Sequence, residues 1–209
     1  MKYGILFALL APSLMAGVIS AQITFKGEPL VSLRTILQGF SNVGYKLEID
    51  SFEAKEGSGE LIAKIVTNKP FNPGALNENL KEQSINVEFS QYKDQKLTMS
   101  LATQSALWSV PLMGSDEGSE VKKTVSPQWF RVEEAQHIRI EPPYAGKWYP
   151  DVAVLDSKMN VLSSFRSSVP KEEMVFELPS GAYYLKVSNA PGMKVLKEGM
   201  WIESMSPGR

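Results

Sequence analysis

The chain has 209 residues, of which 43% are hydrophobic and 22% charged, a composition typical of a globular protein with one large or two small cores. Its 22 basic and 23 acidic side chains give a formal net charge of -1, without any run of Lys or Arg. This balance argues against a nucleic-acid partner, because binding to phosphates requires a concentrated positive surface. The chain has no cysteine, which excludes disulfides, thiolate metal ligands and a lipid-attachment cysteine.

The first 21 residues have the pattern of a secretory signal peptide. Lys2 precedes a short apolar run, and small residues follow as far as Ala21. We expect cleavage after Ala21, with cuts after Ala16 or Gly17 as alternatives. An uncleaved anchor is the competing interpretation, but the apolar run is shorter than the ~20 residues that a spanning helix needs. The pattern predicts a periplasmic protein without a later membrane span, with extracellular release as the alternative.

Residues 22–101 alternate between the periods of strands and helices. A short strand is expected over 23–25. A helix should follow, because apolar residues recur at three- and four-residue steps: Leu30, Leu33, Ile36, Leu37 and Phe40. Pro29 suits the start of this helix and Gly44 its end, where a positive φ is often needed.

The rest of this segment predicts further strands and a second helix. Strands are expected over 45–49 and 61–66, and the Asn72-Pro73 pair suits the start of a short helix. Alternating apolar residues over 85–89 and 97–101 then predict a hairpin. The resulting order, β-α-β-β-α-β-β, is that of a small α+β domain.

A family resemblance is carried by the stretches ITFKGEPLVSLRTILQGFSNVGYKLEID and ELIAKIVTNKPFNPGALNENLKEQSINVEFSQYKDQKLTMSL. They resemble the short N-terminal (STN) domain of secretins and TonB-dependent receptors. The matching positions are Pro29, Leu30, Leu33, Ile36, Leu37, Gly44, Ala75, Leu76 and Leu80. One departure is Ser84, where the family usually has a glycine before the fourth strand. The resemblance implies docking to other proteins of the bacterial envelope.

Residues 102–127 predict a linker between two domains. Turn-forming residues and mixed charges alternate there without a sustained period. Several apolar residues, among them Trp108, are unusual for a solvated tether, so we expect this segment to pack against a domain or a partner.

Residues 128–209 predict an all-β domain. Six or seven short β-rich stretches are separated by turn formers, which favours a sandwich. The stretch YPDVAVLDSKMNVLSSFR…MVFELPSGAYYLKVSN resembles the bacterial pre-peptidase C-terminal domain, a jelly-roll-like β-sandwich. The matching positions are Asp151, Val154, Leu155, Asp156, Leu178, Ser180, Gly181, Tyr183, Tyr184 and Val187. The expected fold class is therefore α+β, with a β-α-β-β-α-β-β domain followed by an all-β sandwich.

Aromatic residues gather around residues 141–152, with the sequence EPPYAGKWYPDV. Tyr144, Trp148 and Tyr149, together with Trp129, could form a stacking surface for a glycan or peptide. The other interpretation is a proline-stiffened connection in which Trp148 or Tyr149 closes the sandwich core.

Enzymatic chemistry has little support in the sequence. His137 is the only histidine and is expected on the strand face opposite Ile138 and Ile140. An S-x-x-K match begins at Ser119, but it has no companion motif and lies in the turn-rich segment. We therefore predict no catalytic, cofactor-binding or metal-binding residues.

The combined features predict a non-enzymatic, exported interaction or scaffolding protein. Its partners would be envelope proteins, and it would act as an accessory subunit of secretion, pilus, flagellar or uptake machinery. The alternative is a soluble periplasmic module that binds glycan or peptide through its loop aromatics. A hydrolase that depends on His137 is the third hypothesis.

Overall fold

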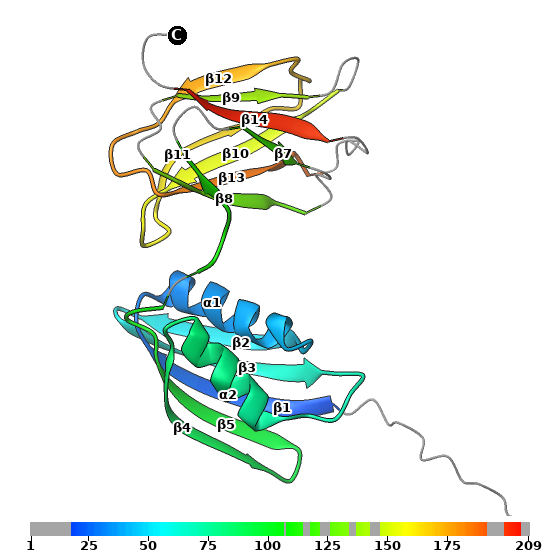
Figure 1. Cartoon of the computed structure of the whole chain (residues 1–209), viewed down its shortest axis with the longest axis vertical. Coiled ribbons are helices and arrows are strands. Elements are labelled where there is room, and N and C mark those ends of the chain that lie inside the picture. Colours follow the sequence, from blue (N-terminus) through cyan, green and yellow to red (C-terminus); the bar gives the residue numbers. More distant parts are fainter. Residues whose placement is uncertain are drawn as a thin grey trace, which may run out of the picture. The chain divides into compact units, whose positions relative to one another are not determined.

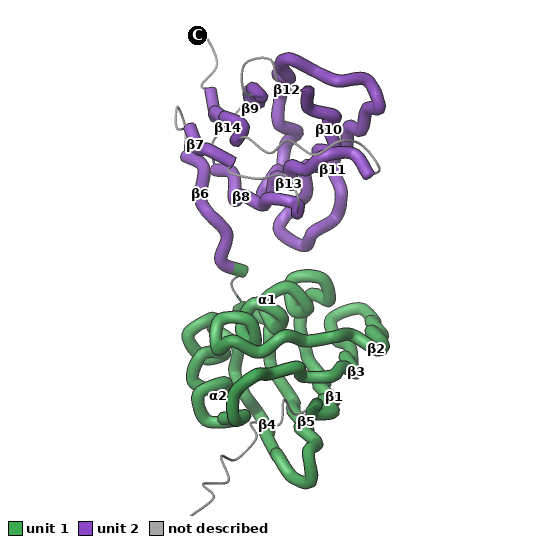
Figure 2. Tube along the Cα trace, turned by 90° about the vertical axis from the view of Figure 1, so that its right-hand side faces the viewer, with its two compact units in different colours: residues 1–108 green, residues 109–209 purple. Residues whose placement is uncertain are grey.

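The computed structural model describes residues 18–106, 108–114, 118–121, 126–133, 137–142, 147–191 and 199–205. The chain forms two compact units, which divide between Trp108 and Ser109 (Figure 2). Each unit has a hydrophobic core of its own. No helix within the described ranges is long and apolar enough to cross a membrane.

The first unit is a five-stranded sheet with two helices on one face (Figure 1). Across the sheet the strands follow the order β2-β3-β1-β5-β4, with β1 antiparallel to β3 and parallel to β5. In chain order the elements are β1 (Val18–Lys26), α1 (Pro29–Asn42), β2 (Lys46–Lys55), β3 (Ser58–Val66), α2 (Pro73–Glu82), β4 (Asn86–Lys93) and β5 (Lys96–Ala102).

Alternation along the central strands separates a core face from a face without helices. In β1, Ile19, Ala21, Ile23 and Phe25 are buried, while the residues between them are exposed or half-buried. β3 and β5 show the same alternation, and their buried residues belong to the same cluster as those of both helices. The period of two residues therefore places the core between the sheet and the helices.

The buried face of α1 differs from the apolar stripe that predicts the helix. Ile36 and Phe40 are fully buried, but Leu30 is 48% exposed. A Cβ atom on Gly39 would lie 2.6 Å from Leu80 Cδ2 of α2. The two helices thus approach each other closely at a glycine, while the first leucine of the stripe faces solvent.

The end of α2 requires a left-handed backbone. Ser84 has a φ of 58°, and its N–H donates to the carbonyl of Lys81 at 2.9 Å. The N–H of Ile85 then donates to the carbonyl of Leu80 at 3.0 Å. Glycine adopts this conformation most easily, so a serine here carries a backbone cost.

The first unit begins earlier than expected. β1 starts at Val18 rather than after Ala21, and Ile19 and Ala21 are each only 2% exposed. Ala21 lies opposite Ala63 of β3 and Leu97 of β5, in the middle of the sheet. A cut after Ala21 would therefore remove four residues of the central strand, whereas a cut after position 16 or 17 leaves β1 whole.

The second unit is a sandwich of two sheets whose strands are mainly antiparallel. One sheet has the order β11-β10-β13-β8-β6 and the other β12-β9-β14-β7. One cluster of buried residues contains side chains from both sheets. The strands are β6 (Leu112–Met113), β7 (Gly118–Val121), β8 (Gln128–Val132), β9 (His137–Glu141), β10 (Pro150–Leu155), β11 (Val161–Arg166), β12 (Met174–Glu177), β13 (Tyr184–Asn189) and β14 (Met200–Met205).

Residues 102–127 do not form a linker throughout. β6 pairs in parallel with β8, and β7 pairs with β14, so both belong to the sandwich. Met113 and Val121 are each 2% exposed and lie in its core. At the other end, Thr103 donates from its backbone N–H to the Lys26 carbonyl at 2.7 Å within the first unit. The segment that connects the two units is therefore far shorter than the sequence pattern predicts.

Candidate functional site

Trp148, the centre of the expected aromatic surface, is a core residue. Its side chain has no exposed area, and its indole Nε1–H donates to the Ser188 carbonyl at 3.1 Å. Its own carbonyl accepts from the Lys171 N–H at 2.8 Å, which fixes the backbone on both sides of the ring. The prediction that this ring is available for stacking is wrong; the alternative, in which it closes the sandwich core, holds.

The other expected rings do not form one exposed surface with it. Trp129 is half-buried on β8, where it lies opposite Lys186 of β13. Tyr149 is also half-buried, and its backbone carbonyl accepts a hydrogen bond from the N–H of Ala190, which follows β13. Tyr144 lies outside the described residues.

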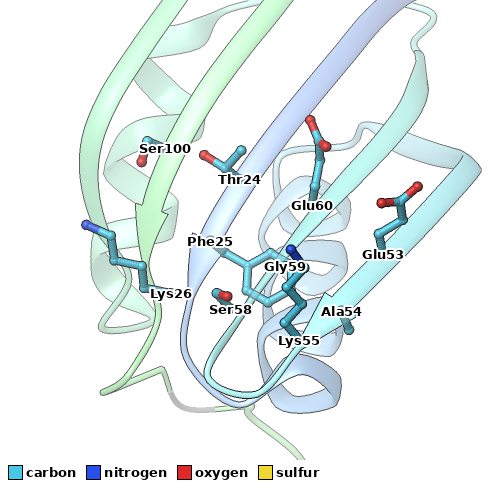
Figure 3. Close-up of a pocket in the computed structure, with 10 residues that line it drawn as sticks. All are labelled: Thr24, Phe25, Lys26, Glu53, Ala54, Lys55, Ser58, Gly59, Glu60 and Ser100. Atoms are coloured by element: carbon cyan, nitrogen blue, oxygen red, sulfur yellow. The ribbon is translucent and has the colours of Figure 1, made fainter.

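A wide depression lies on the helix-free face of the first unit (Figure 3). It has a volume of about 650 Å³ and is lined by the end of β1, the β2–β3 hairpin and one residue of β5. Figure 3 shows Thr24, Glu60 and Glu53 along three neighbouring strands, with Lys26 and Lys55 further toward the hairpin end. Most of the lining residues are of polar types and come from strands, so their positions are set by sheet register.

Several polar side chains of this depression are bound to neighbouring residues of the same sheet. Lys26 forms an ion pair with Glu88 at 3.1 Å, and the Ser100 hydroxyl donates to the same carboxylate at 3.2 Å. The hydrogen bond from Lys26, followed by that from Ser100, lowers the pKa of the Glu88 carboxyl. Gln22 donates to Glu60 at 2.7 Å. The depression is thus a polar sheet surface rather than a set of groups that converge on a reacting atom.

His137 and Ser119 both lie in short strands of the second unit. His137 is half-buried at the start of β9 and lies opposite Glu177 of β12. Its side chain is on the face of the strand opposite to that of the buried Ile138 and Ile140. Ser119 lies in β7, so the helical turn that an S-x-x-K nucleophile needs is not formed there. Within the described ranges, no group of three or more His, Asp or Glu side chains could hold a metal ion.

β11 is an exposed edge strand with large apolar side chains at both ends, which the sequence analysis included only among the β-rich stretches. All six of its residues are exposed, and within the described part of the chain it pairs with β10 alone. Val161, Leu162 and Phe165 are its large apolar side chains, with exposed fractions of 62%, 39% and 39%. The strand has one charged residue, Arg166, whose Nε donates to Asp151 at 3.0 Å. The sequence contained a signal for this exposure, because alternate residues of VLSSFR place both apolar and polar side chains on each face of the strand.

Trp201 was also missed, although alternation could have found it. Met200 and Ile202 of β14 are buried, so the residue between them must lie on the outer face of the sheet. Trp201 is 46% exposed there.

Asp151 anchors a polar network on the outer face of the other sheet. Its carboxylate accepts hydrogen bonds from Lys186 at 3.0 Å, Ser188 at 2.8 Å and Arg166 at 3.0 Å. Burial is the strongest single influence and raises the pKa of this carboxyl. Together, however, the hydrogen bonds from Lys186, Ser188 and Arg166 outweigh burial and leave the pKa below its usual value. Asp151 is therefore a structural residue that ties β10 to β11 and β13.

Asp151→Asn should therefore weaken the sandwich in a pH-dependent way. At pH 7 we expect the free energy of unfolding to fall by about 1–3 kcal/mol, the range for groups left without a buried partner. Because the folded-state pKa lies below the unfolded one, the stability that Asp151 contributes is present above about pH 4 and is lost as the pH falls through the folded value. The difference in free energy of unfolding between the parent and Asp151→Asn, measured by urea unfolding, should thus be larger at pH 7 than at pH 3. Equal differences at both pH values would contradict the prediction; Glu53→Gln is the exposed control.

No protein-family model matches this chain, and no curated protein matches it. Among solved structures, it is similar to the pre-peptidase C-terminal domain of a collagenase from Bacillus anthracis. The identity is 13% and the TM-score 0.32, over 46% of this chain and 93% of that domain. A β-glucosidase from Paenibacillus barengoltzii is similar with 17% identity and a TM-score of 0.24, over 44% of this chain and 11% of the enzyme. Both similarities concern fold alone.

Proposed function

We propose that this chain is an exported, non-enzymatic interaction protein that serves as an accessory component of a bacterial envelope assembly. The observation that carries the proposal is the exposed apolar edge strand β11. Natural proteins usually protect such edges with charges, prolines or short strands, because unpaired N–H and C=O groups can recruit another strand. An edge that lacks this protection favours a partner that completes it.

Strand addition is the binding mode that β11 supports. An incoming strand would gain main-chain hydrogen bonds from the free edge, and its side chains would contact apolar residues on both faces. Phe165 lies opposite Val152, a core residue, and is nevertheless 39% exposed, so the sheet extends beyond the part that the core covers. A partner strand would bury this overhang and gain hydrophobic free energy.

The first unit supports the envelope part of the proposal. Its elements follow the order β1-α1-β2-β3-α2-β4-β5, which is the order that the resemblance to the STN domain implies. Ser84, where that family usually has a glycine, adopts a φ of 58°, a conformation that suits glycine. The signal-peptide pattern of the first residues lies outside the described ranges and supports export by its sequence alone.

The test is to capture the partner through β11 in the intact envelope. A photo-crosslinking residue at Ser164, in the middle of the strand, should give one discrete protein adduct from the periplasmic side. Val161→Lys/Leu162→Lys should reduce that adduct at least several-fold, because two charges oppose pairing at an edge. Val18→Lys/Ile62→Lys is the matched control, since both of its positions are exposed on the sheet of the first unit.

Two results would contradict the proposal. One is an adduct pattern that β11 charges leave unchanged, because the edge would then not be the contact. The other is retention of the protein in the cytoplasmic fraction after osmotic shock, because export is part of the proposal. Purified protein that hydrolyses an envelope polymer in a His137-dependent way would instead favour an enzyme.

A further inference from the structure

The indole ring of Trp201 packs against a glycine of a neighbouring strand. β14 runs between β9 and β7 (Figure 1), and Trp201 stands opposite Glu120 of β7 and Glu141 of β9. Its six-membered ring covers Gly118, where a Cβ atom would clash with it. Trp201 nevertheless remains 46% exposed, so part of the ring contacts the glycine and part is open to solvent.

A second glycine positions the acid next to the ring. A Cβ atom on Gly199 would lie 2.8 Å from Glu120 Oε1, so this side chain leans over the glycine as the ring leans over Gly118. Both carboxylates and the ring line one open cavity of about 330 Å³, together with Pro142, Gly199 and Met200. This volume is at the small end of the about 300–1,000 Å³ range of ligand pockets, which suits a single side chain.

The surroundings of the cavity are acidic. Glu203 follows the ring on the same outer face of β14, two residues after Trp201, and lies opposite Arg139 of β9. That arginine is engaged by acids, since its Nε lies 2.8 Å from Glu173 and 3.6 Å from Glu141. Among the described residues, no ion pair involves Glu120. Among the described residues, the exposed part of the ring is therefore flanked by more carboxylates than cations, because Arg139 is the one basic residue of this group and two acids already engage it.

We infer that this cavity binds the guanidinium group of an arginine side chain in a partner protein. A guanidinium is planar and can stack on an indole face while its N–H groups donate to a carboxylate at the rim. The flat ring supplies the stacking face, and Glu120 and Glu141 on the two flanking strands supply the acceptors. This site lies on the sheet opposite to that of β11, so the inference does not depend on strand addition.

The binding test uses the full chain and a blocked pentapeptide, acetyl-Gly-Gly-Arg-Gly-Gly-amide. Titration should shift the indole N–H signal of Trp201 in a proton–nitrogen NMR spectrum, with that signal assigned from Trp201→Phe. The citrulline peptide, which has the same shape without the charge, should give little shift. Binding should also weaken as NaCl rises from 20 to 500 mM, because exposed charges are screened.

Variants separate the parts of the site. Glu120→Gln and Glu141→Gln should each lower the affinity for the arginine peptide roughly two- to five-fold, the range that exposed ion pairs contribute. Gly118→Val, which displaces the ring without removing it, should weaken binding about tenfold, as expected when a cation–π contact is lost. Glu53→Gln, an exposed carboxylate of the first unit, should have no effect. Unchanged amide signals of β13 show that each variant remains folded.

Three outcomes would overturn the inference. The citrulline peptide could bind as well as the arginine peptide, or the two glutamate variants could bind as tightly as the parent. A neutral chito-oligosaccharide could also shift the Trp201 signal without salt dependence, which would make the ring a sugar platform. None of these results bears on the β11 adduct, so failure here and failure of the proposed function are distinguishable.

Discussion

Replacing Trp148 with alanine is expected to lower the free energy of unfolding of the second unit by about 3–5 kcal/mol, the range for removal of a large buried aromatic side chain. Its ring has no exposed area and contacts a core that both sheets share. Trp148→Phe should cost less, about 1–3 kcal/mol, because burial is mostly kept while the Ser188 carbonyl loses its indole donor. The measurement is urea unfolding of the full chain, followed by NMR signals of β10 and β13.

Trp201→Ala is the matched control for this prediction. Trp201 is also a tryptophan of the second unit, but it lies on the outer face and is 46% exposed, so its removal should cost about 1 kcal/mol or less. If Trp148→Ala were as mild as Trp201→Ala, the ring would not support the core. The interpretation of residues 141–152 as an aromatic binding surface would then return.

The two tryptophans show which side-chain positions a local sequence pattern contains and which it does not. Trp201 belongs to a strand with regular alternation, so its outward position follows from its buried neighbours Met200 and Ile202. Trp148 lies between prolines and outside any strand, where it makes one isolated bridge to Lys171. No local period reports that its ring turns inward, because the core that receives it is assembled from strands far along the chain.

The same distinction explains the segment that resembled a linker. β7 has four residues and pairs with β14, about eighty positions later, while β6 has two residues and pairs with β8. Strands this short show no usable alternation, and their pairing is set by tertiary contacts. By contrast, the helices and the longer strands of the first unit carry enough turns or alternations to be located from sequence. Even there, the helical period does not give burial residue by residue, since Leu30 belongs to the apolar stripe of α1 and is 48% exposed.

Gly27→Ala is expected to destabilise the first unit by about 2–4 kcal/mol, because it combines backbone strain with steric overlap. Gly27 has a φ of 150°, a backbone angle that residues other than glycine rarely adopt. A Cβ atom there would clash with the Thr103 hydroxyl and lie 2.9 Å from the Thr103 carbonyl carbon. That hydroxyl is buried and bonded to Ser32 at 2.6 Å, so it cannot simply rotate into solvent. Thermal and urea unfolding of the full chain, followed by signals of α1, would measure the loss.

Gly57→Ala separates the two causes. Gly57 also has a positive φ, of 69°, but a Cβ atom there would meet nothing within 4 Å, so only the strain of about 1 kcal/mol should appear. Adding Thr103→Ala to Gly27→Ala should recover part of the loss, because the overlap is removed while the strain remains. Full additivity of the two substitutions would contradict the steric argument. Recovery would instead show that the end of β1, the start of α1 and the chain leaving β5 are held together at one glycine, which is why residues beyond 101 belong to the first unit.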